Sequence, residues 1–136
     1  MTDGRFAISL HILTLLARSE GKYLSSDDIA GSVNINPVLV RKEMSNLKKA
    51  GLILSKEGRK GGSQLARPAS QILLAEVYQS VKKESLLGWP RNNPNAHCPV
   101  GCKMFNHLQQ MYDEVEETLL EKLSGMNLAE FYSQFQ

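Results

Sequence analysis

The chain has 136 residues, of which 42% are hydrophobic and 22% are charged, so it can form one domain with a hydrophobic core and a modest extension. This composition excludes an intrinsically disordered chain, and no apolar run reaches the roughly 18 residues that a membrane-spanning helix needs. The first residues, MTDGRF, lack the pattern of a secretion signal, because an acidic residue stands near the front and no small-residue cleavage site follows the apolar stretch. We therefore expect a cytoplasmic protein with no membrane partner.

Charge is unevenly distributed along the chain. Residues 1–83 carry thirteen Lys and Arg against seven Asp and Glu, a net charge of +6, whereas residues 84–136 carry three against seven, a net charge of −4. A basic front half suits contact with a polyanion, and an acidic rear half would avoid one. A chance distribution is the alternative.

The first two predicted helices lie in the basic half. Residues 6–17 are apolar on most sides, which is typical of a buried helix, and Gly21 favours an end near residue 20. Ser25 followed by Asp28 forms a helix N-cap pattern, so a second helix is expected there. Turn-forming residues between positions 31 and 34 predict that this helix is short.

A third helix is predicted from the pair Asn36-Pro37, because Asn caps a helix and Pro suits its first position. It runs to about Ala50, and Gly51 ends it. The turn of about four residues between the second and third helices has the spacing of a helix-turn-helix, although other helical hairpins share that spacing.

The third helix has two distinct faces when its residues are placed at about 100° steps. Val40, Met44 and Leu47 fall on the side that should face the core. The opposite face has three cations and no acidic residue, a combination suited to DNA phosphates and base edges. A charged face that is merely solvated is the alternative. The candidate DNA-contacting residues of this segment are Asn36, Val38, Arg41, Lys42, Ser45 and Lys49.

A β-hairpin is predicted next, because residues 52–56 and 63–68 flank a glycine-rich loop. Arg59 and Lys60 stand at its tip, where they could reach the DNA backbone or minor groove, and the glycines could allow a phosphate to approach closely. No Lys-Ser or Lys-Thr pair closes the loop and no helix opens directly after Gly62, which argues against a nucleotide-phosphate loop. The fold class is therefore mainly α with a small β-hairpin, a winged helix-turn-helix domain.

The rear half predicts helices separated by a loop. A fourth helix over residues 72–81 should pack on the first, and three prolines favour a loop over 86–99. A long helix follows over about 100–124, and a short one over about 127–132. A heptad-like apolar stripe on the long helix predicts a homodimer interface, with packing on the chain's own core as the alternative. The stripe consists of Phe105, Leu108, Tyr112, Val115 and Leu119.

These features together resemble the Rrf-two family of bacterial regulators, which includes the IscR, NsrR and CymR types. The resemblance covers nearly the whole chain and rests on residues 4–7, 29–30, 47–52, 61–62, 65–69 and 128–131. Residues 93–95 and 97–101 are similar to those of the YwnA-type branch. The resemblance implies a homodimer held by the long C-terminal helix, which binds a palindromic operator on double-stranded DNA, usually as a repressor. The two recognition helices would lie about 34 Å apart in successive major grooves.

The expected domain organisation follows from this resemblance. Residues 1–83 form the DNA-binding domain, residues 84–99 a sensor-type loop, and residues 100–136 the dimerisation helices. Iron–sulfur members of the family place three cysteines in that loop, whereas this chain has only Cys98 and Cys102. His97 and His107 could supplement them, but a full set of ligands for a cluster or for zinc is not evident. We therefore expect no cofactor and no metal, and an iron–sulfur cluster is kept only as an alternative.

The two cysteines are instead candidates for redox sensing. Cys102 lies near the N-terminus of the long helix and Cys98 just before it, where free backbone N–H groups and the helix dipole stabilise a thiolate. Oxidation there could move the loop and change the angle between the DNA-binding halves. Cysteines without a sensing role are the alternative.

No enzyme is expected, because the sequence contains no nucleophile–base pair, zincin motif or Walker loop. Two other functions stay open at this stage. One is an interaction adaptor that keeps the winged fold without binding DNA. The other is a repressor that responds to a small molecule bound between the winged domain and the long helix.

Overall fold

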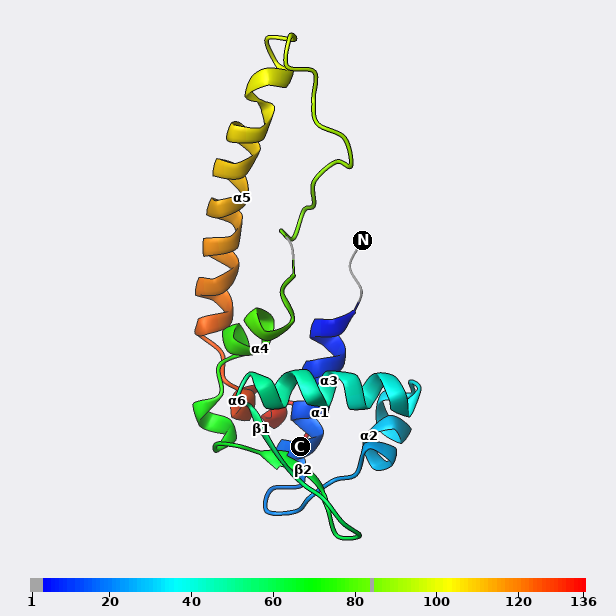
Figure 1. Cartoon of the computed structure of the whole chain (residues 1–136). Helices are drawn as coiled ribbons and strands as arrows, with labels where there is room; N and C mark the ends of the chain where they lie inside the picture. Colours follow the sequence, from blue (N-terminus) through cyan, green and yellow to red (C-terminus); the bar gives the residue numbers. More distant parts are fainter. Residues whose placement is uncertain (1–3, 84) are drawn as a thin grey trace.

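The computed structural model describes residues 4–83 and 85–136. Residues 1–3, which open the predicted DNA-binding domain, and Glu84, which opens the predicted loop, lie outside the described residues. The predicted fold class is confirmed: the chain is mainly helical, with one two-stranded antiparallel hairpin (Figure 1). The elements in chain order are α1 (Arg5–Arg18), α2 (Ser26–Val33), α3 (Pro37–Lys49), β1 (Ile53–Lys56), β2 (Gly62–Leu65), the 3-10 helix η1 (Ala69–Gln71), α4 (Leu74–Val81), α5 (Gly101–Ser124) and α6 (Leu128–Ser133).

The helix-turn-helix is fixed by local caps. The Ser25 hydroxyl accepts a hydrogen bond from the Asp28 N–H at 3.1 Å, and the Asp28 carboxylate accepts one from the Ser25 N–H. Helix α2 continues through Gly31 to Val33, further than the turn-forming residues predicted, because only Asn34 adopts the left-handed conformation that ends it, at φ 62°. Asn36 then caps α3 by accepting the Val38 N–H at 2.8 Å, with Pro37 in the first turn as predicted.

Two glycines of the hairpin are required by close contacts of the backbone. Strand β1 pairs with β2 so that Ile53 lies opposite Leu65, and Leu24 forms a bridge with Ser63 at the edge. A Cβ atom at Gly62 would lie 2.3 Å from the Leu24 carbonyl oxygen, and one at Gly61 would lie 2.1 Å from the Lys56 carbonyl oxygen. Glycine is therefore needed at both positions because the protein's own backbone passes so close to them.

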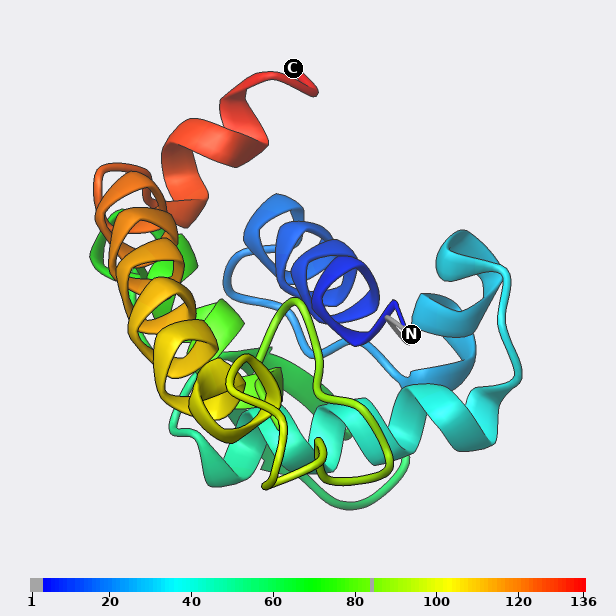
Figure 2. The ribbon, with the colours of Figure 1, turned by 90° about the horizontal axis from the view of Figure 1, so that it is seen from above.

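The core is built around α1, which lies in the middle of the winged domain (Figure 2). Ile12, Leu13 and Leu16 of this helix are almost fully buried. Each neighbouring element adds buried apolar side chains to the same cluster. These include Ile29, Val40, Leu47, Leu52, Ile53, Ile72, Val77 and Leu128.

The C-terminal segment returns to this core. Leu128 is 0% exposed, its N–H donates to the Ile72 carbonyl at 2.8 Å, and the Leu74 N–H donates to the Met126 carbonyl at 2.9 Å. Helix α6 also contacts α1. Helix α6 thus packs into the winged core, whereas α5 and the loop before it project from that core (Figure 1).

Helix α5 projects from the winged domain, and none of its 24 residues is buried (Figure 1). The end of α5 nearer to the winged domain packs on α4, and the segment that follows α4 runs alongside α5. Trp89 in that segment stacks on Phe105 and also contacts Tyr112, each with ring centroids 4.8 Å apart. The Tyr112 hydroxyl donates to the Gly88 carbonyl at 2.8 Å. The loop is thus attached to the outer half of α5.

Candidate nucleic-acid interface

Helix α3 presents a cationic surface to solvent. Arg41, Lys42, Ser45 and Lys49 are all exposed, and Val38 is 61% exposed near the start of the helix. The residues expected to face the core, Val40, Met44 and Leu47, are buried. Positive charge and short polar or apolar groups on one exposed helix face can contact both phosphates and base edges.

Four polar contacts hold α3 in place. Glu43 is 5% exposed and accepts hydrogen bonds from Arg5 Nε at 2.8 Å and from the Ser9 hydroxyl at 3.3 Å, which attaches α3 to α1. Asn46 donates from Nδ2 to the Ser80 carbonyl of α4 at 2.8 Å. Arg41 also lies 3.5 Å from the Ser26 hydroxyl of α2.

Sequence reasoning missed Glu43 and Asn46 as positioning residues. The sequence contained a signal for Glu43, because it is the acidic residue of an otherwise cationic helix. At about 100° of rotation per residue, its position on the helix also lies beside the face that packs on the core. A carboxylate at such a boundary needs a buried donor. No local pattern indicated that Arg5, far away in the sequence, would supply it.

The hairpin carries a second group of cations. Arg59 and Lys60 are exposed at its tip, as expected, and the tip lies apart from α3 at the far end of the hairpin (Figure 1). Strand β1 contacts α3, so the hairpin is attached to the same helix that carries the cationic face. Lys56 lies at the loop end of the hairpin, where it pairs with Gly62. Its Nζ lies 5.8 Å from the centre of the Tyr23 ring.

The two cysteines lie at the far end of α5 (Figure 1). Cys98 is partly buried and Cys102 is exposed, and the Cys102 N–H donates to the Cys98 carbonyl at 3.0 Å. Hydrogen bonds from the backbone N–H groups of Gly101 and then Val100 lower the pKa of the Cys98 thiol from its ordinary value of 9.0. A Cβ atom at Gly101 would lie 2.5 Å from the Asn95 carbonyl oxygen, so this turn is closely packed.

The predicted apolar stripe on α5 is partly covered by the protein itself. Trp89 lies on Phe105 and Tyr112, and Leu108 lines a small cavity of about 90 Å³ beneath residues 89–94. Val115 and Leu119, nearer to α4, are half-buried. Phe105 nevertheless stays 57% exposed, beside the exposed side chains of Met104 and Met111. The exposed apolar surface of α5 is therefore displaced toward the methionine side of the stripe.

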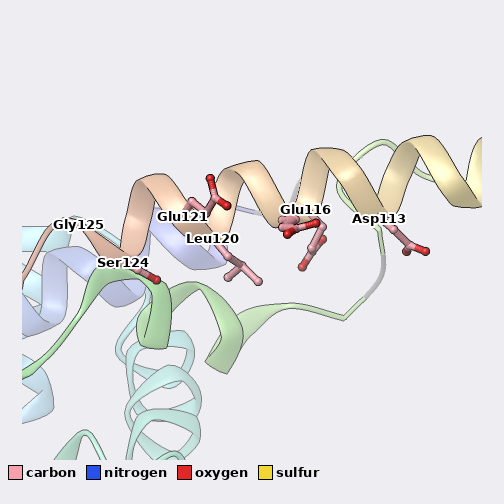
Figure 3. Close-up of a pocket in the computed structure, with 7 residues that line it drawn as sticks. Asp113, Glu116, Leu120, Glu121, Ser124 and Gly125 are labelled. Carbon is pink, nitrogen blue, oxygen red and sulfur yellow. The ribbon is translucent and has the colours of Figure 1, made fainter.

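The acidic side of α5 lines an open cavity of about 680 Å³ (Figure 3). Its acidic lining residues are Asp113, Glu116, Glu117 and Glu121. Glu116 lies toward α4, where it accepts a hydrogen bond from the Tyr78 hydroxyl at 3.3 Å and pairs with Lys82 Nζ at 2.6 Å. These contacts raise the pKa of Lys82, chiefly through the hydrogen bond to Glu116, while burial and then Glu116 raise the pKa of Tyr78.

An apolar groove of about 830 Å³ lies between α1 and α6, on another part of the winged domain. Phe6, Leu10 and Phe131 line it, together with Phe135, which is 64% exposed. His11 stands at its edge with Nε2 3.0 Å from the Ser32 hydroxyl.

Among the described residues, no helix is long and apolar enough to cross a membrane.

The chain matches known regulators along almost its whole length. Residues 2–134 match the Rrf2 family, described as iron-dependent transcriptional regulators. YwnA of Bacillus subtilis (strain 168), which carries the name of an HTH-type transcriptional regulator, is 41% identical over 128 residues, covering 94% of each chain. A crystal structure described as that of a DNA binding protein superposes with a TM-score of 0.74 at 35% identity, over 93% of this chain and 97% of the other. CymR, described as the global cysteine regulator of B. subtilis, shares the fold with a TM-score of 0.73 at 18% identity, over 98% and 97%.

The family description names iron, but the side chains of the described residues do not fit an iron site. The chain has two cysteines, and within residues 4–83 and 85–136 no group of three His, Cys, Asp or Glu could hold a metal ion. A two-iron cluster takes four protein ligands. The donors here fall short of that number.

The match along residues 2–134, the 41% identity to a regulator of the same length and the exposed cationic helix agree with one another. The chain belongs to the Rrf2 family and is a DNA-binding transcriptional regulator.

Proposed function

We propose that the protein is a homodimeric repressor that works in the cytoplasm, catalyses no reaction and binds a palindromic operator on double-stranded DNA. The observation that supports this most is the exposed face of α3, where Arg41, Lys42 and Lys49 surround Ser45 without an acidic neighbour on that face. Asn36 and Val38 at the start of the helix enter the major groove first. Arg59 and Lys60 at the hairpin tip contact the backbone or the minor groove alongside.

The operator can be identified by selecting the genomic fragments that the purified protein retains. Fluorescence anisotropy then measures the affinity of the protein for that operator. Arg41→Ala and Lys42→Ala should each weaken operator binding about tenfold or more, because a bidentate base contact contributes about 1–3 kcal/mol. Lys103→Ala, at the far end of α5, is the charge-matched control and should bind as the unmodified protein does. If no fragment is retained at low salt, the protein is an adaptor that has kept the winged fold without binding DNA.

The proposed dimer is held by α5. A 24-residue helix in which no residue is buried gains little from its own chain, whereas pairing with a second copy would bury its exposed apolar side chains. The proposed interface contains the stripe of Phe105, Leu108, Tyr112, Val115 and Leu119, extended by Met104 and Met111. We assign the groove between α1 and α6 to the same interface, because it is apolar, open and of a size to accept side chains from a partner's helix.

Sedimentation velocity tests this interface. Phe135→Asp, in the groove, should raise the dimer dissociation constant about tenfold or more, since it places a charge in an apolar contact. Gln134→Asp adds the same charge to the neighbouring exposed position and should leave the dimer intact. Equal effects of the two substitutions would remove the groove from the interface.

A thiol switch is the second proposed function, and the lowered pKa of Cys98 supports it. The Cys98 thiolate attacks a peroxide, takes one oxygen as a sulfenic acid and releases water or an alcohol. The thiol of Cys102 then displaces water to form a disulfide. One helical turn separates the two residues, about 6 Å between Cα atoms, which lies within disulfide range.

Operator binding before and after peroxide tests the switch. Peroxide should weaken DNA binding by the unmodified protein, and Cys98→Ser should abolish this response. Cys102→Ser should stop at the sulfenic acid, which a dimedone adduct detects by mass spectrometry. Oxidised protein with unchanged operator affinity would show that these cysteines do not control DNA binding.

A further inference from the structure

A basic cleft lies between α3 and the end of α4. Its α3 side belongs to the predicted DNA-contacting face, whereas its α4 side lies outside the residues that the sequence assigned to DNA. Its volume is about 450 Å³, and none of the described residues that line it is acidic. Lys42, Ser45 and Lys49 form its wall on α3, whereas Lys82 and Lys83 follow the last residue of α4. The cleft therefore continues the cationic face of α3 onto a second element, α4. Helix α4 and the hairpin lie on opposite sides of α3 (Figure 1).

A hydrogen bond between α3 and α4 holds the two sides of the cleft in place. Asn46 donates from its side-chain amide to the Ser80 carbonyl at 2.8 Å. This bond fixes the end of α4 beside α3. It also occupies a carbonyl at the negative end of the α4 dipole, where an unpaired oxygen would repel an anion. The cations on the two sides of the cleft are thus held close together, and no acidic side chain of residues 4–83 and 85–136 lines the space between them.

The two lysines of the α4 end differ in their partners. Lys82 pairs with Glu116 of α5 at 2.6 Å, so part of its charge is already neutralised. Lys83 is exposed and forms no ion pair within residues 4–83 and 85–136. Lys42 and Lys49 are likewise exposed and unpaired within those ranges. Lys83 is therefore the residue outside α3 that is best placed to hold an added negative charge.

The chemistry of the cleft fits a phosphodiester. Lysine ammonium groups bind phosphates as point charges, and the Ser45 hydroxyl can donate to a phosphate oxygen. The cleft is open and shares its α3 wall with the proposed recognition surface, so a duplex seated on α3 would bring backbone phosphates to it. We propose that this cleft binds a phosphate of the DNA backbone and that Lys83 is its main contact from α4. This proposal rests on the proposed placement of α3 in the major groove.

The salt dependence of operator affinity tests the proposal. Lys83→Ala should reduce the slope of log affinity against log salt by about 0.9 for each bound subunit, the value for one lost phosphate contact. For one subunit, the ratio of unmodified to variant affinity should then fall about 3.5-fold between about 50 and about 200 mM salt. Preference among operator sequences should not change, because a phosphate contact does not read bases. Lys103→Ala loses the same charge on α5 and should keep the full slope.

Two further measurements complete the test. Ethylation interference should show one phosphate per half-site whose modification weakens the unmodified protein but has no effect on Lys83→Ala. Inorganic phosphate at constant ionic strength should not compete with the operator, and competition that Lys83→Ala abolishes would assign the cleft to a free phosphate instead. Identical slopes for Lys83→Ala and Lys103→Ala would overturn the proposal, whereas an unmodified protein that does not bind DNA would overturn the proposed function itself.

Discussion

The winged domain and helix α5 differ in how they bury their apolar side chains. In the winged domain, α1 is surrounded by other elements and several of its residues are 0–1% exposed, whereas α5 has 24 residues and none is buried. The first region satisfies its hydrophobic surface within one chain. The second leaves Met104, Phe105 and Met111 in contact with solvent. The contrast indicates that the winged domain has its apolar side chains covered within one chain, whereas α5 has apolar surface available for another molecule.

The largest expected effect comes from the centre of the winged domain. Leu13→Ala should lower the free energy of unfolding by about 3 kcal/mol, because it removes a fully buried side chain and leaves a cavity. Urea unfolding followed by circular dichroism measures the change. Leu108→Ala, on the half-buried side of α5, should cost clearly less at concentrations where the protein is monomeric. Equal losses would mean that α5 is as well packed as the core.

The next effect concerns the buried ion pair that attaches α3 to α1. Glu43→Gln should reduce the free energy of unfolding by about 1–3 kcal/mol, since Arg5 Nε and the Ser9 hydroxyl lose a charged acceptor. Operator affinity should also fall, because α3 is no longer held at the same angle. Glu121→Gln, an exposed position on α5, is the matched control. An unchanged stability for Glu43→Gln would show that this pair contributes nothing net.

A smaller effect is expected on α5 itself. Met111→Glu should weaken the dimer about tenfold, because a charge would enter the apolar contact, while thermal unfolding of the winged core stays nearly unchanged. Gln110→Glu places the same charge on the polar side of the helix and serves as the control. Analytical ultracentrifugation distinguishes the two. A monomeric unmodified protein at micromolar concentration would contradict the proposed role of α5.

The smallest effect should appear where the two regions meet, at the base of α5. The pKa values of Tyr78 and Lys82 are both raised in the folded protein, from 10.0 and 10.5. A group with a raised folded pKa contributes stability below its unfolded pKa and loses that contribution as pH rises through the folded value. The free energy of unfolding should therefore decline as the pH rises past the ordinary pKa values of these two groups, about 10 to 10.5. Tyr78→Phe and Lys82→Met should each make that decline shallower, and an unaltered decline in both would exclude the cluster with Glu116 as its source.

Local sequence signals determined the order and type of the elements. Ser25 with Asp28, Asn36 with Pro37, and Gly51 fix the ends of α2 and α3, and each acts within one or two turns of chain. The cationic face of α3 could also be predicted, because the 100° step relates neighbouring turns of a single helix. Such signals are readable because every group involved is close in sequence.

Only the tertiary structure decided which faces meet. Trp89 covers part of the stripe on α5, Glu116 pairs with Lys82, and Leu128 returns to the core beside Ile72. These contacts join segments that lie far apart along the chain, and helical periodicity gives the angle of a residue on its helix but not the element that packs there. The physical reason is that burial is a property of the assembled elements, so an apolar or charged stripe has no assigned partner until they pack.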